Sequence, residues 1–210
     1  GGRGGTVTSS GHAAETLVLF PLMAPGMEVI VSNKLYGGTI NLMGKSFRKF
    51  GWNAVFVDND NPEAFRAAVT EKTRAIFVES LANPGGVIVD LEAIAKIAQE
   101  AEVPLIVDNT MATPWLCRPF EWGADLVVHS TTKFLSGQGN AMGGIVIDSG
   151  RFPWFGNAKY PSLSEPCPDY NGLTFAETFG DMAFTLYSHA VSLRDLGCTQ
   201  SPMNAWITLN

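Results

Sequence analysis

Short apolar runs alternate along this chain with segments of helical periodicity, and this alternation limits the possible folds more than any other feature. Strands are expected before the turn at residues 9–11 and at residues 28–32, 53–57, 74–79, 103–108, 125–128 and 143–147. Helices are expected at residues 12–23, 40–50, 62–70, 91–101 and 175–196, and from Ser201 onward. Strands and helices that alternate at this spacing form βαβ units, so the sequence predicts an α/β fold with a mainly parallel sheet flanked by helices.

Composition excludes several classes of protein. The 210 residues are 46% hydrophobic, which is ordinary for a globular chain and sufficient for a sizeable core. The net charge of -6 is spread over interspersed acids and bases, so a basic surface for nucleic acid is not expected. Apolar runs fall well short of the roughly 18 residues that span a membrane. Three widely spaced cysteines, Cys117, Cys167 and Cys198, fit a reducing cytoplasm.

Polar residues follow several predicted strands at the point where each strand ends. Tyr36, Asn83, Asp108 and Lys133 each come just after an apolar run, and the turn at Gly11 also follows a strand. In parallel sheets, ligands bind at the carboxyl ends of the strands. We therefore expect these five features, which are distant in sequence, to line one rim.

The residue types on this rim suit one cofactor. A carboxylate such as Asp108 at the mouth of a buried strand is costly without a cationic partner, and a protonated pyridine nitrogen would be one. A lysine such as Lys133 can form the Schiff base that enzymes dependent on pyridoxal phosphate (PLP) require. Tyr36 could lay its ring against a flat cofactor. These groups together indicate a PLP site.

A phosphate group would also find donors on this rim. The turn at Gly11 exposes backbone N–H groups at the positive end of a helix dipole, which favours anions. Ser130 and Thr132 lie just before Lys133 in the sequence and could donate to the same phosphate. Ser-Gly before a helix is also an ordinary helix cap, so the signal is weak without the neighbouring features.

Each residue alone has a structural alternative. Lys133 could be a surface lysine at a strand end, Asp108 could cap a turn, and Tyr36 could be a loop aromatic. Asn83-Pro84 is also a common turn signal. Their occurrence together on one rim favours the cofactor site.

Two other classes of site are excluded. Gly137-Gln138-Gly139 and Gly143-Gly144 precede a predicted strand and do not link a strand to a helix, so they are not a dinucleotide fingerprint. The histidines lack metal-ligand spacing, and we expect no metal site at His12, His129 and His189.

The motifs occur in an order and spacing that resembles the Cys/Met-metabolism family of PLP enzymes. The segments that carry the resemblance are Ser10-Gly11-His12-Ala13-Ala14, Tyr36-Gly37-Gly38-Thr39, Glu79-Ser80-Leu81-Ala82-Asn83-Pro84, Val107-Asp108-Asn109-Thr110 and His129-Ser130-Thr131-Thr132-Lys133-Phe134. The resemblance implies the large domain of a PLP-dependent transferase of aminotransferase fold type I. Further segments are more similar to O-acetylhomoserine sulfhydrylases than to other branches: Gly144-Ile145-Val146-Ile147-Asp148-Ser149-Gly150, Phe179-Gly180, Leu193-Arg194-Asp195-Leu196-Gly197 and Ser201-Pro202-Met203-Asn204-Ala205.

The resemblance also implies residue roles. Lys133 would hold PLP and shuttle protons, Asp108 would keep the pyridine nitrogen protonated, and Tyr36 would stack on the ring and assist proton transfer. Asn83 would contact the ring hydroxyl or the substrate carboxylate. The phosphate would be held by the backbone of Gly11 and His12, together with Ser130 and Thr132. The cofactor-binding set implied in this way is Gly11, His12, Tyr36, Asn83, Asp108, Ser130, Thr132 and Lys133.

The implied activity is a γ-replacement in methionine and cysteine biosynthesis (trans-sulfuration). O-acetylhomoserine and sulfide would give homocysteine and acetate. The alternatives are a cystathionine γ-synthase, a methionine or cystathionine γ-lyase, and a non-catalytic fragment that keeps the fold. The family resemblance also implies a cytoplasmic homo-oligomer, a homotetramer built as a dimer of dimers.

The domain organisation follows from the same resemblance. Residues 1–175 are expected to form the PLP-binding core, and residues 176–210 to form helices that lead toward a C-terminal domain. We expect a fragment without the family's N-terminal arm and C-terminal small domain, and therefore a poor catalyst alone. The segment 148–175, rich in Gly, Pro and aromatic residues, is expected to be a functional or partner-binding loop.

Overall fold

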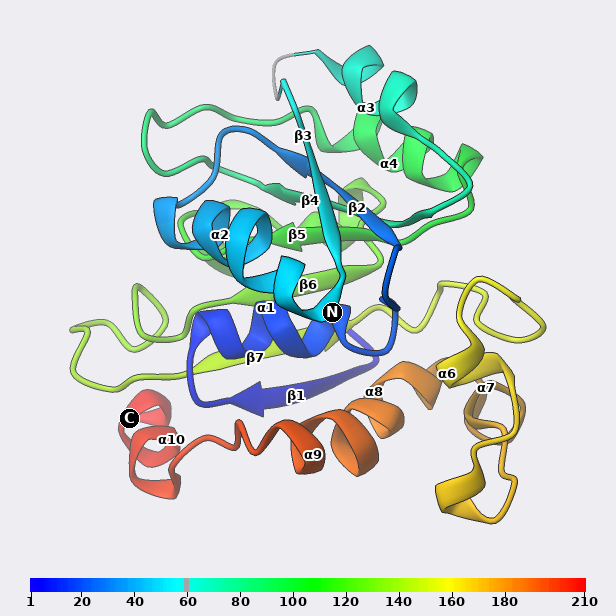
Figure 1. The fold of residues 1–210 in the computed structure, drawn as a ribbon. Coiled ribbons are helices and arrows are strands. Elements are labelled where there is room, and N and C mark those ends of the chain that lie inside the picture. Colours follow the sequence, from blue (N-terminus) through cyan, green and yellow to red (C-terminus); the bar gives the residue numbers. More distant parts are fainter. Residues whose placement is uncertain (59–60) are drawn as a thin grey trace. The chain divides into compact units, whose positions relative to one another are not determined.

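The computed structural model describes residues 1–58 and 61–210. Within this part, hydrogen bonds join seven strands in the order β1-β7-β6-β5-β4-β2-β3 (Figure 1). The strands are β1 (Gly4–Thr8), β2 (Glu28–Ser32), β3 (Asn53–Val57), β4 (Thr73–Glu79), β5 (Leu105–Asp108), β6 (Leu126–His129) and β7 (Gly144–Asp148). The mainly parallel sheet that the sequence predicts is confirmed, because β2, β3, β4 and β5 pair in parallel and β1 pairs antiparallel with β7.

The chain divides into two compact units. Unit 1 contains Gly1–Leu22 and Val128–Asn210, and unit 2 contains Met23–Val127. Each unit is described separately below.

Unit 2 is built from successive βαβ connections. Its helices include α2 (Gly37–Asn41), α3 (Pro62–Ala68) and α4 (Leu91–Glu100). Figure 1 shows α3 and α4 side by side, with α2 on the other side of the parallel strands. Right-handed crossovers require this division, because the chain moves outward from β2 to β3 and then returns to β4 and β5.

The amphipathic helix α4 begins where the sequence predicts. Its N-cap, Asp90, accepts a hydrogen bond at Oδ1 from the backbone N–H of Ala93, 3.0 Å away. The buried face consists of Leu91, Ile94, Ile97 and Ala98. Ala95 is only half-buried.

The predicted helix at residues 40–50 is more complex in the structure. α2 begins earlier, at Gly37, and is followed by a π-helical segment η1 (Leu42–Ser46) and a 3-10 segment η2 (Phe47–Phe50). The last turn closes at Gly51, whose φ of 75° is the left-handed conformation that glycine adopts readily. Periodicity locates the helical region but not these local changes of pitch.

Unit 1 contains the antiparallel pair β1 and β7, in which Gly4 lies opposite Asp148 and Thr8 lies opposite Gly144. Helix α1 (Gly11–Leu19) packs against β7. The predicted extension of this helix to residue 23 is wrong. The helix ends at Leu19 with Phe20 as its C-cap, because Pro21 has no N–H to donate the next helical hydrogen bond.

The aromatic segment at residues 148–175 packs on itself inside unit 1. It contains α6 (Pro161–Ser164) and a short 3-10 turn, η4 (Pro168–Tyr170). Trp154 and Tyr160 are 3% and 0% exposed, with ring centroids 5.2 Å apart. Trp154 also stacks on Phe184 at 5.5 Å. The segment therefore contributes Trp154 and Tyr160 to the hydrophobic core of unit 1, although most of its residues are exposed or half-buried.

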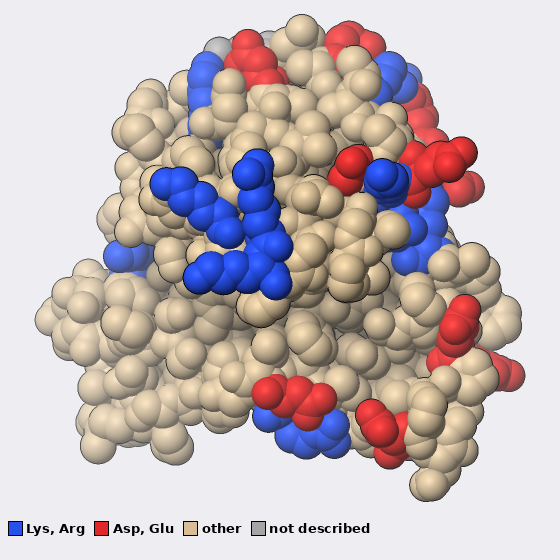
Figure 2. Space-filling view, viewed as in Figure 1, with Lys and Arg blue, Asp and Glu red and all other residues tan. Residues whose placement is uncertain are grey.

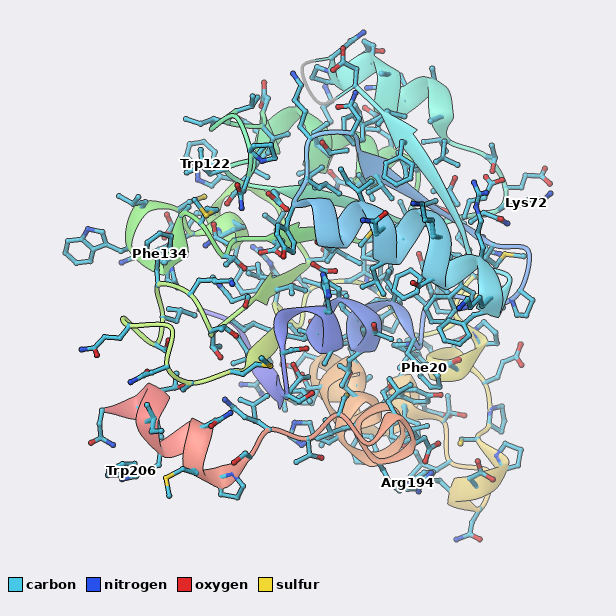
Figure 3. The ribbon with its side chains drawn as sticks, turned by 60° about the vertical axis from the view of Figure 1, so that its left-hand side comes forward. Phe20, Lys72, Trp122, Phe134, Arg194 and Trp206 are labelled. Atoms are coloured by element: carbon cyan, nitrogen blue, oxygen red, sulfur yellow. The ribbon has the colours of Figure 1, made fainter. Side chains whose placement is uncertain are left out.

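The single helix predicted at residues 175–196 is wrong. The structure contains α7 (Phe175–Phe179), η5 (Gly180–Met182), α8 (Ala183–Tyr187), η6 (Ser188–Leu193) and α9 (Arg194–Leu196). Gly180, with a φ of 54°, separates the first two, since this conformation cannot continue a right-handed helix. The predicted end at Gly197 is confirmed, and α10 (Pro202–Leu209) follows. Figure 3 marks the later segments with Arg194 and Trp206.

Charged side chains form small separate groups on the face shown in Figure 2, and most of that face is uncharged. Among the described residues, none of the helices combines the length and the apolar character needed to cross a membrane. Cys117, Cys167 and Cys198 are all free thiols.

Candidate functional site

The candidate residues of unit 2 gather around a carboxylate at the end of β4. Glu79 is 5% exposed, and each of its oxygens accepts one backbone hydrogen bond. Oε1 accepts from the N–H of Tyr36 at 2.7 Å, and Oε2 accepts from the N–H of Asn83 at 2.9 Å. Two loops that are far apart in sequence are thereby tied to the same side chain.

Asp108 lies at the end of the neighbouring strand, β5. The parallel register of β4 and β5 pairs Glu79 directly with Asp108. The Oδ1 atom of Asp108 accepts hydrogen bonds from the backbone N–H and the hydroxyl of Thr110, at 2.8 and 2.5 Å. Asp108 therefore caps a turn, as the structural alternative proposed, and it also stands beside the Glu79 group.

Burial disfavours charge on both carboxyls. It raises the pKa of Glu79 to about 7, against the opposing effect of the two N–H donors, and the nearby Asp108 charge adds to the increase. Burial also raises the pKa of Asp108, and the Thr110 hydrogen bonds lower it by less. Neither carboxyl forms an ion pair with a lysine or arginine of the residues that the structure describes. This pair of acids would be stabilised by a bound cation.

A buried polar network supports these strand ends. The hydroxyl of Ser80 donates to Oδ1 of Asn109 at 2.6 Å, and Nδ2 of Asn109 donates to the carbonyl of Cys117 at 2.9 Å. The backbone N–H of Ser80 donates to the carbonyl of Asp108 at 3.0 Å. The carboxylates are therefore presented by a fixed frame, while the side chains of Tyr36 (49% exposed) and Asn83 remain accessible to a ligand.

The candidate residues of unit 1 gather at the start of α1. Ser10 is the N-cap, and its Oγ accepts from the N–H of Ala13 at 3.1 Å. A Cβ added at Gly11 would lie 2.7 Å from Cβ of Ser130, so only glycine allows the helix to approach this closely. The first turn of α1 and Ser130 are thus in contact, as the phosphate-site prediction requires. Partial burial lowers the pKa of His12 in the same turn.

Thr132 does not simply face an open site. Its hydroxyl donates to the carbonyl of Gly143 at 3.2 Å and accepts from the N–H of the same residue at 3.1 Å. A hydroxyl has one proton to donate, so Thr132 fastens the loop to Gly143. Its predicted role in phosphate binding stays a prediction. That role would require the hydroxyl to donate its hydrogen bond to the phosphate instead of to the carbonyl of Gly143.

Lys133 lies on the turn that directly follows β6, and its side chain is exposed. Its backbone N–H donates to the carbonyl of Ser130 at 3.4 Å. The hydroxyl of Ser136 donates to the carbonyls of Thr132 and Lys133, at 3.1 and 3.3 Å. Phe134, the next residue, marks this loop in Figure 3. The turn is held by its backbone, and the amine of Lys133 is left accessible.

Sequence reasoning missed the role of Glu79. The residue was recognised only as part of a motif, although a charged residue that ends a buried apolar strand was a usable signal. Its partners lie 43 and four residues away, and the more distant one could not be identified from local pattern.

Comparisons with known proteins give a consistent result. The chain matches the family described as Cys/Met metabolism PLP-dependent enzyme over residues 1–210. It is 47% identical to O-acetyl-L-homoserine sulfhydrylase of Leptospira meyeri over 98% of this chain and 48% of the relative. It is 44% identical to O-acetyl-L-homoserine sulfhydrylase 1 of Thermus thermophilus over 100% of this chain and 50% of that protein.

A solved structure from Campylobacter jejuni is also similar. It is assigned as an O-acetylhomoserine (thiol)-lyase and contains N′-pyridoxyl-lysine-5′-monophosphate. The TM-score is 0.96 and the sequence identity 38%, covering 100% of this chain and 52% of the other. The chain thus spans about half the length of the relatives that it matches.

Proposed function

This chain belongs to the Cys/Met metabolism family of PLP-dependent enzymes, and we propose that it serves a γ-replacement in which O-acetylhomoserine and sulfide give homocysteine and acetate. The observation that carries the proposal is the position of Lys133. It lies on the strand-end turn that also contains Ser130, and Ser130 contacts Gly11 in the first turn of α1. A lysine therefore occurs on the same turn as a residue that contacts a helix N-terminus, which supports the combination of amine and anion site that a phosphorylated aldehyde cofactor requires.

The residues present fit PLP in their chemistry. The N–H groups of Gly11 and His12 and the hydroxyl of Ser130 suit its phosphate, with Thr132 as a further donor. The carboxyl of Asp108 suits the protonated ring nitrogen, because a cation there offsets the cost of burying its charge. When bound, PLP supplies an electron sink for negative charge that develops on the substrate carbons.

The protein side chains would supply positioning and proton transfer. Lys133 would hold the cofactor, and its amine would move protons at Cα and Cβ of the substrate. Tyr36 presents an exposed ring to stack on the cofactor and assists proton transfer. Asn83 contacts the ring hydroxyl or the carboxylate of the substrate. Asp108 keeps the ring nitrogen protonated.

The names of the relatives support the choice of substrate. The Leptospira and Thermus proteins are called O-acetyl-L-homoserine sulfhydrylases, and a yeast relative that is 39% identical is called homocysteine/cysteine synthase. These names favour sulfide transfer over the γ-synthase and γ-lyase alternatives. We propose in addition that the protein is cytoplasmic and acts as a homotetramer, and that residues 176–210 lead toward a further domain of the whole protein.

The direct test compares two lysine variants after incubation with PLP. Lys133→Ala should lose the visible absorbance band of the bound cofactor, because the amine that holds the cofactor is gone. Lys72 is an exposed lysine that directly precedes β4 (Figure 3), and Lys72→Ala should keep the band. A band of equal strength in both variants would overturn the proposal.

The reaction can be separated from its alternatives by substrate. O-acetylhomoserine with sulfide should give homocysteine faster than the same substrate with cysteine gives cystathionine. It should also react faster than methionine or cystathionine is broken down. Faster γ-elimination from methionine or cystathionine would favour the γ-lyase alternative, and preference for cysteine would favour the γ-synthase.

A further inference from the structure

One buried carboxylate in unit 2 has no role in the proposed chemistry but touches two of its residues. Glu79 is 5% exposed, in a strand whose neighbouring residues Ile76, Phe77 and Val78 are fully buried. Within residues 1–58 and 61–210, its side chain accepts hydrogen bonds from the backbone N–H groups of Tyr36 and Asn83. Burial of an acid in such a strand is costly, so its retention here calls for a compensating interaction.

The first of these bonds fixes the start of α2. Tyr36 is the residue before the helix, and its carbonyl accepts the hydrogen bond from Ile40 that begins the helical pattern, at 3.1 Å. The N-terminal residues of a helix leave their N–H groups without partners inside the helix, and the side chain of Tyr36 forms no cap hydrogen bond. The Oε1 atom of Glu79 therefore holds the backbone from which the Tyr36 ring projects.

The second bond fixes the loop after β4. This loop closes on itself, because Ala82 donates to the carbonyl of Val87 at 2.8 Å and Gly86 donates to the carbonyl of Ala82 at 3.0 Å. The bond from Asn83 to Oε2 of Glu79 ties the closed loop back to the strand, at 2.9 Å. The exposed side chain of Asn83 is thereby set relative to β4.

The strand register connects both loops to Asp108. Glu79 and Asp108 lie opposite each other in adjacent parallel strands, so a loop anchored to Glu79 is also placed relative to Asp108. One side chain thus fixes the mutual arrangement of three candidate residues of unit 2. Above pH 7 the carboxyl of Glu79 is mainly ionised, because its pKa is about 7, and its hydrogen bonds are then charge-assisted and roughly twice as strong as neutral ones.

We propose that Glu79 is a positioning residue that holds the backbones of Tyr36 and Asn83 so that their side chains meet the cofactor ring and the substrate beside Asp108. The proposal rests on the proposed function for what the two side chains contact, but the anchoring itself does not depend on it. Glu79 acts through other residues and touches neither cofactor nor substrate.

The test measures amide hydrogen exchange in the chain without cofactor. Glu79→Gln keeps the shape of the side chain but replaces one acceptor oxygen by an NH₂ donor, so the two loops can no longer both be anchored. We expect exchange at Tyr36 or Asn83 to become roughly ten- to a hundredfold faster, the size of effect expected when a hydrogen bond to a charged group is lost.

Thr73→Val is the matched control. Thr73 is 1% exposed, stands at the opposite end of the same strand, and its hydroxyl accepts from the backbone N–H of Thr70 at 2.9 Å. The variant should speed exchange at Thr70 and leave Tyr36 and Asn83 unchanged. Unchanged exchange at both Tyr36 and Asn83 in Glu79→Gln would overturn the proposal, as would equal acceleration there in Thr73→Val.

A second readout tests the consequence for the cofactor. After loading with PLP, Glu79→Gln should change the circular dichroism of the cofactor band, because Tyr36 no longer sits in its position. Thr73→Val should keep the wild-type spectrum, and so should Glu79→Gln if the anchor has no effect on the site, which would contradict the positioning role. Failure of wild type to bind PLP at all would refute the proposed function, while the exchange result would still decide whether Glu79 anchors the loops.

Discussion

The candidate site residues of the two compact units differ in the kind of group they offer. Unit 1 contributes the amine of Lys133, the hydroxyl of Ser130 and the N–H groups at the start of α1. Unit 2 contributes two acids, Glu79 and Asp108, whose pKa values are both raised by burial. One set suits an anion and the other suits a cation.

Under the proposed function, the first set would suit the phosphate of PLP and the second its basic ring nitrogen. The two units also build their candidate sites in different ways. Unit 1 relies on close backbone approach, since Gly11 leaves no room for a Cβ beside Ser130. Unit 2 relies on buried carboxyls: Glu79 accepts hydrogen bonds from two loops, and Asp108 is suited to a cationic partner. Variants in unit 1 should therefore act through shape, and variants in unit 2 through charge.

The largest effect is expected at the charge of Asp108. Asp108→Asn keeps an oxygen that can accept from Thr110 but cannot stabilise a protonated ring nitrogen, so turnover should fall by roughly 10²–10³-fold, as when a preorganised electrostatic group is removed. Steady-state kinetics with O-acetylhomoserine and sulfide measures this effect. Asp90→Asn is the control, because Asp90 also accepts a backbone N–H, from Ala93, but at the exposed cap of α4. A loss of turnover no larger than that of Asp90→Asn would contradict the role assigned to the charge of Asp108.

The second effect is a dependence of stability on pH. The pKa of Glu79 rises from 4.5 to about 7 on folding, so the folded chain binds more protons than the unfolded chain between these values. Stability should therefore fall as pH rises from about 4.5 to 7, by on the order of 3 kcal/mol from this group. Asp108, with a raised pKa, contributes with the same sign.

Urea unfolding of the cofactor-free chain at pH 5 and pH 8 measures this dependence. Glu79→Gln should be less sensitive to pH than wild type, because its amide does not titrate. An equal pH dependence in wild type and variant would show that Glu79 does not carry the buried charge assigned to unit 2.

The third effect tests the role of shape in unit 1. Gly11→Ala would place a Cβ 2.7 Å from Cβ of Ser130, so the helix terminus or the Ser130 turn must move. Overpacking of this kind costs about 1–3 kcal/mol, and PLP affinity should weaken together with the free energy of unfolding. Gly37→Ala is the matched control, since a Cβ there meets nothing within 4 Å. Equal losses in the two variants would contradict the close-approach account.

The smallest effect concerns the cap of α1. Ser10→Ala removes the hydrogen bond from Ala13 to Oγ and should lower the free energy of unfolding by about 1 kcal/mol. Ser201→Ala, at the start of α10, should have less effect because the side chain of Ser201 forms no cap hydrogen bond. Thermal unfolding of the two variants gives the comparison, and a larger loss in Ser201→Ala would contradict it.

The strands could be predicted from the sequence because their signals are local. The apolar runs of β2 and β3 end at the residues predicted, Asp108 is the last residue of β5, and Lys133 lies on the turn after β6. Parallel strands align their carboxyl ends, so residues distant in sequence could be assigned to strand ends without knowledge of side-chain contacts. The contact between Gly11 and Ser130 supports the predicted phosphate site in the same way.

The rest depends on contacts that a local pattern does not contain. The helix predicted at residues 175–196 is interrupted at Gly180, which has a positive φ of 54°. The bond between Glu79 and Tyr36 joins residues 43 positions apart. The hydroxyl of Thr132 forms hydrogen bonds with the backbone of Gly143. The sequence motif, which predicts a phosphate donor at Thr132, does not indicate this contact.

The most direct test of the central claim is to locate the cofactor on the chain. After loading with PLP and reduction with borohydride, mass spectrometry of the digested protein identifies the lysine that carries the phosphopyridoxyl group. The account predicts that group on Lys133, with the label lost in Lys133→Ala and retained in Lys72→Ala. A label on a different lysine, or a chain that remains unlabelled at saturating PLP, would contradict it.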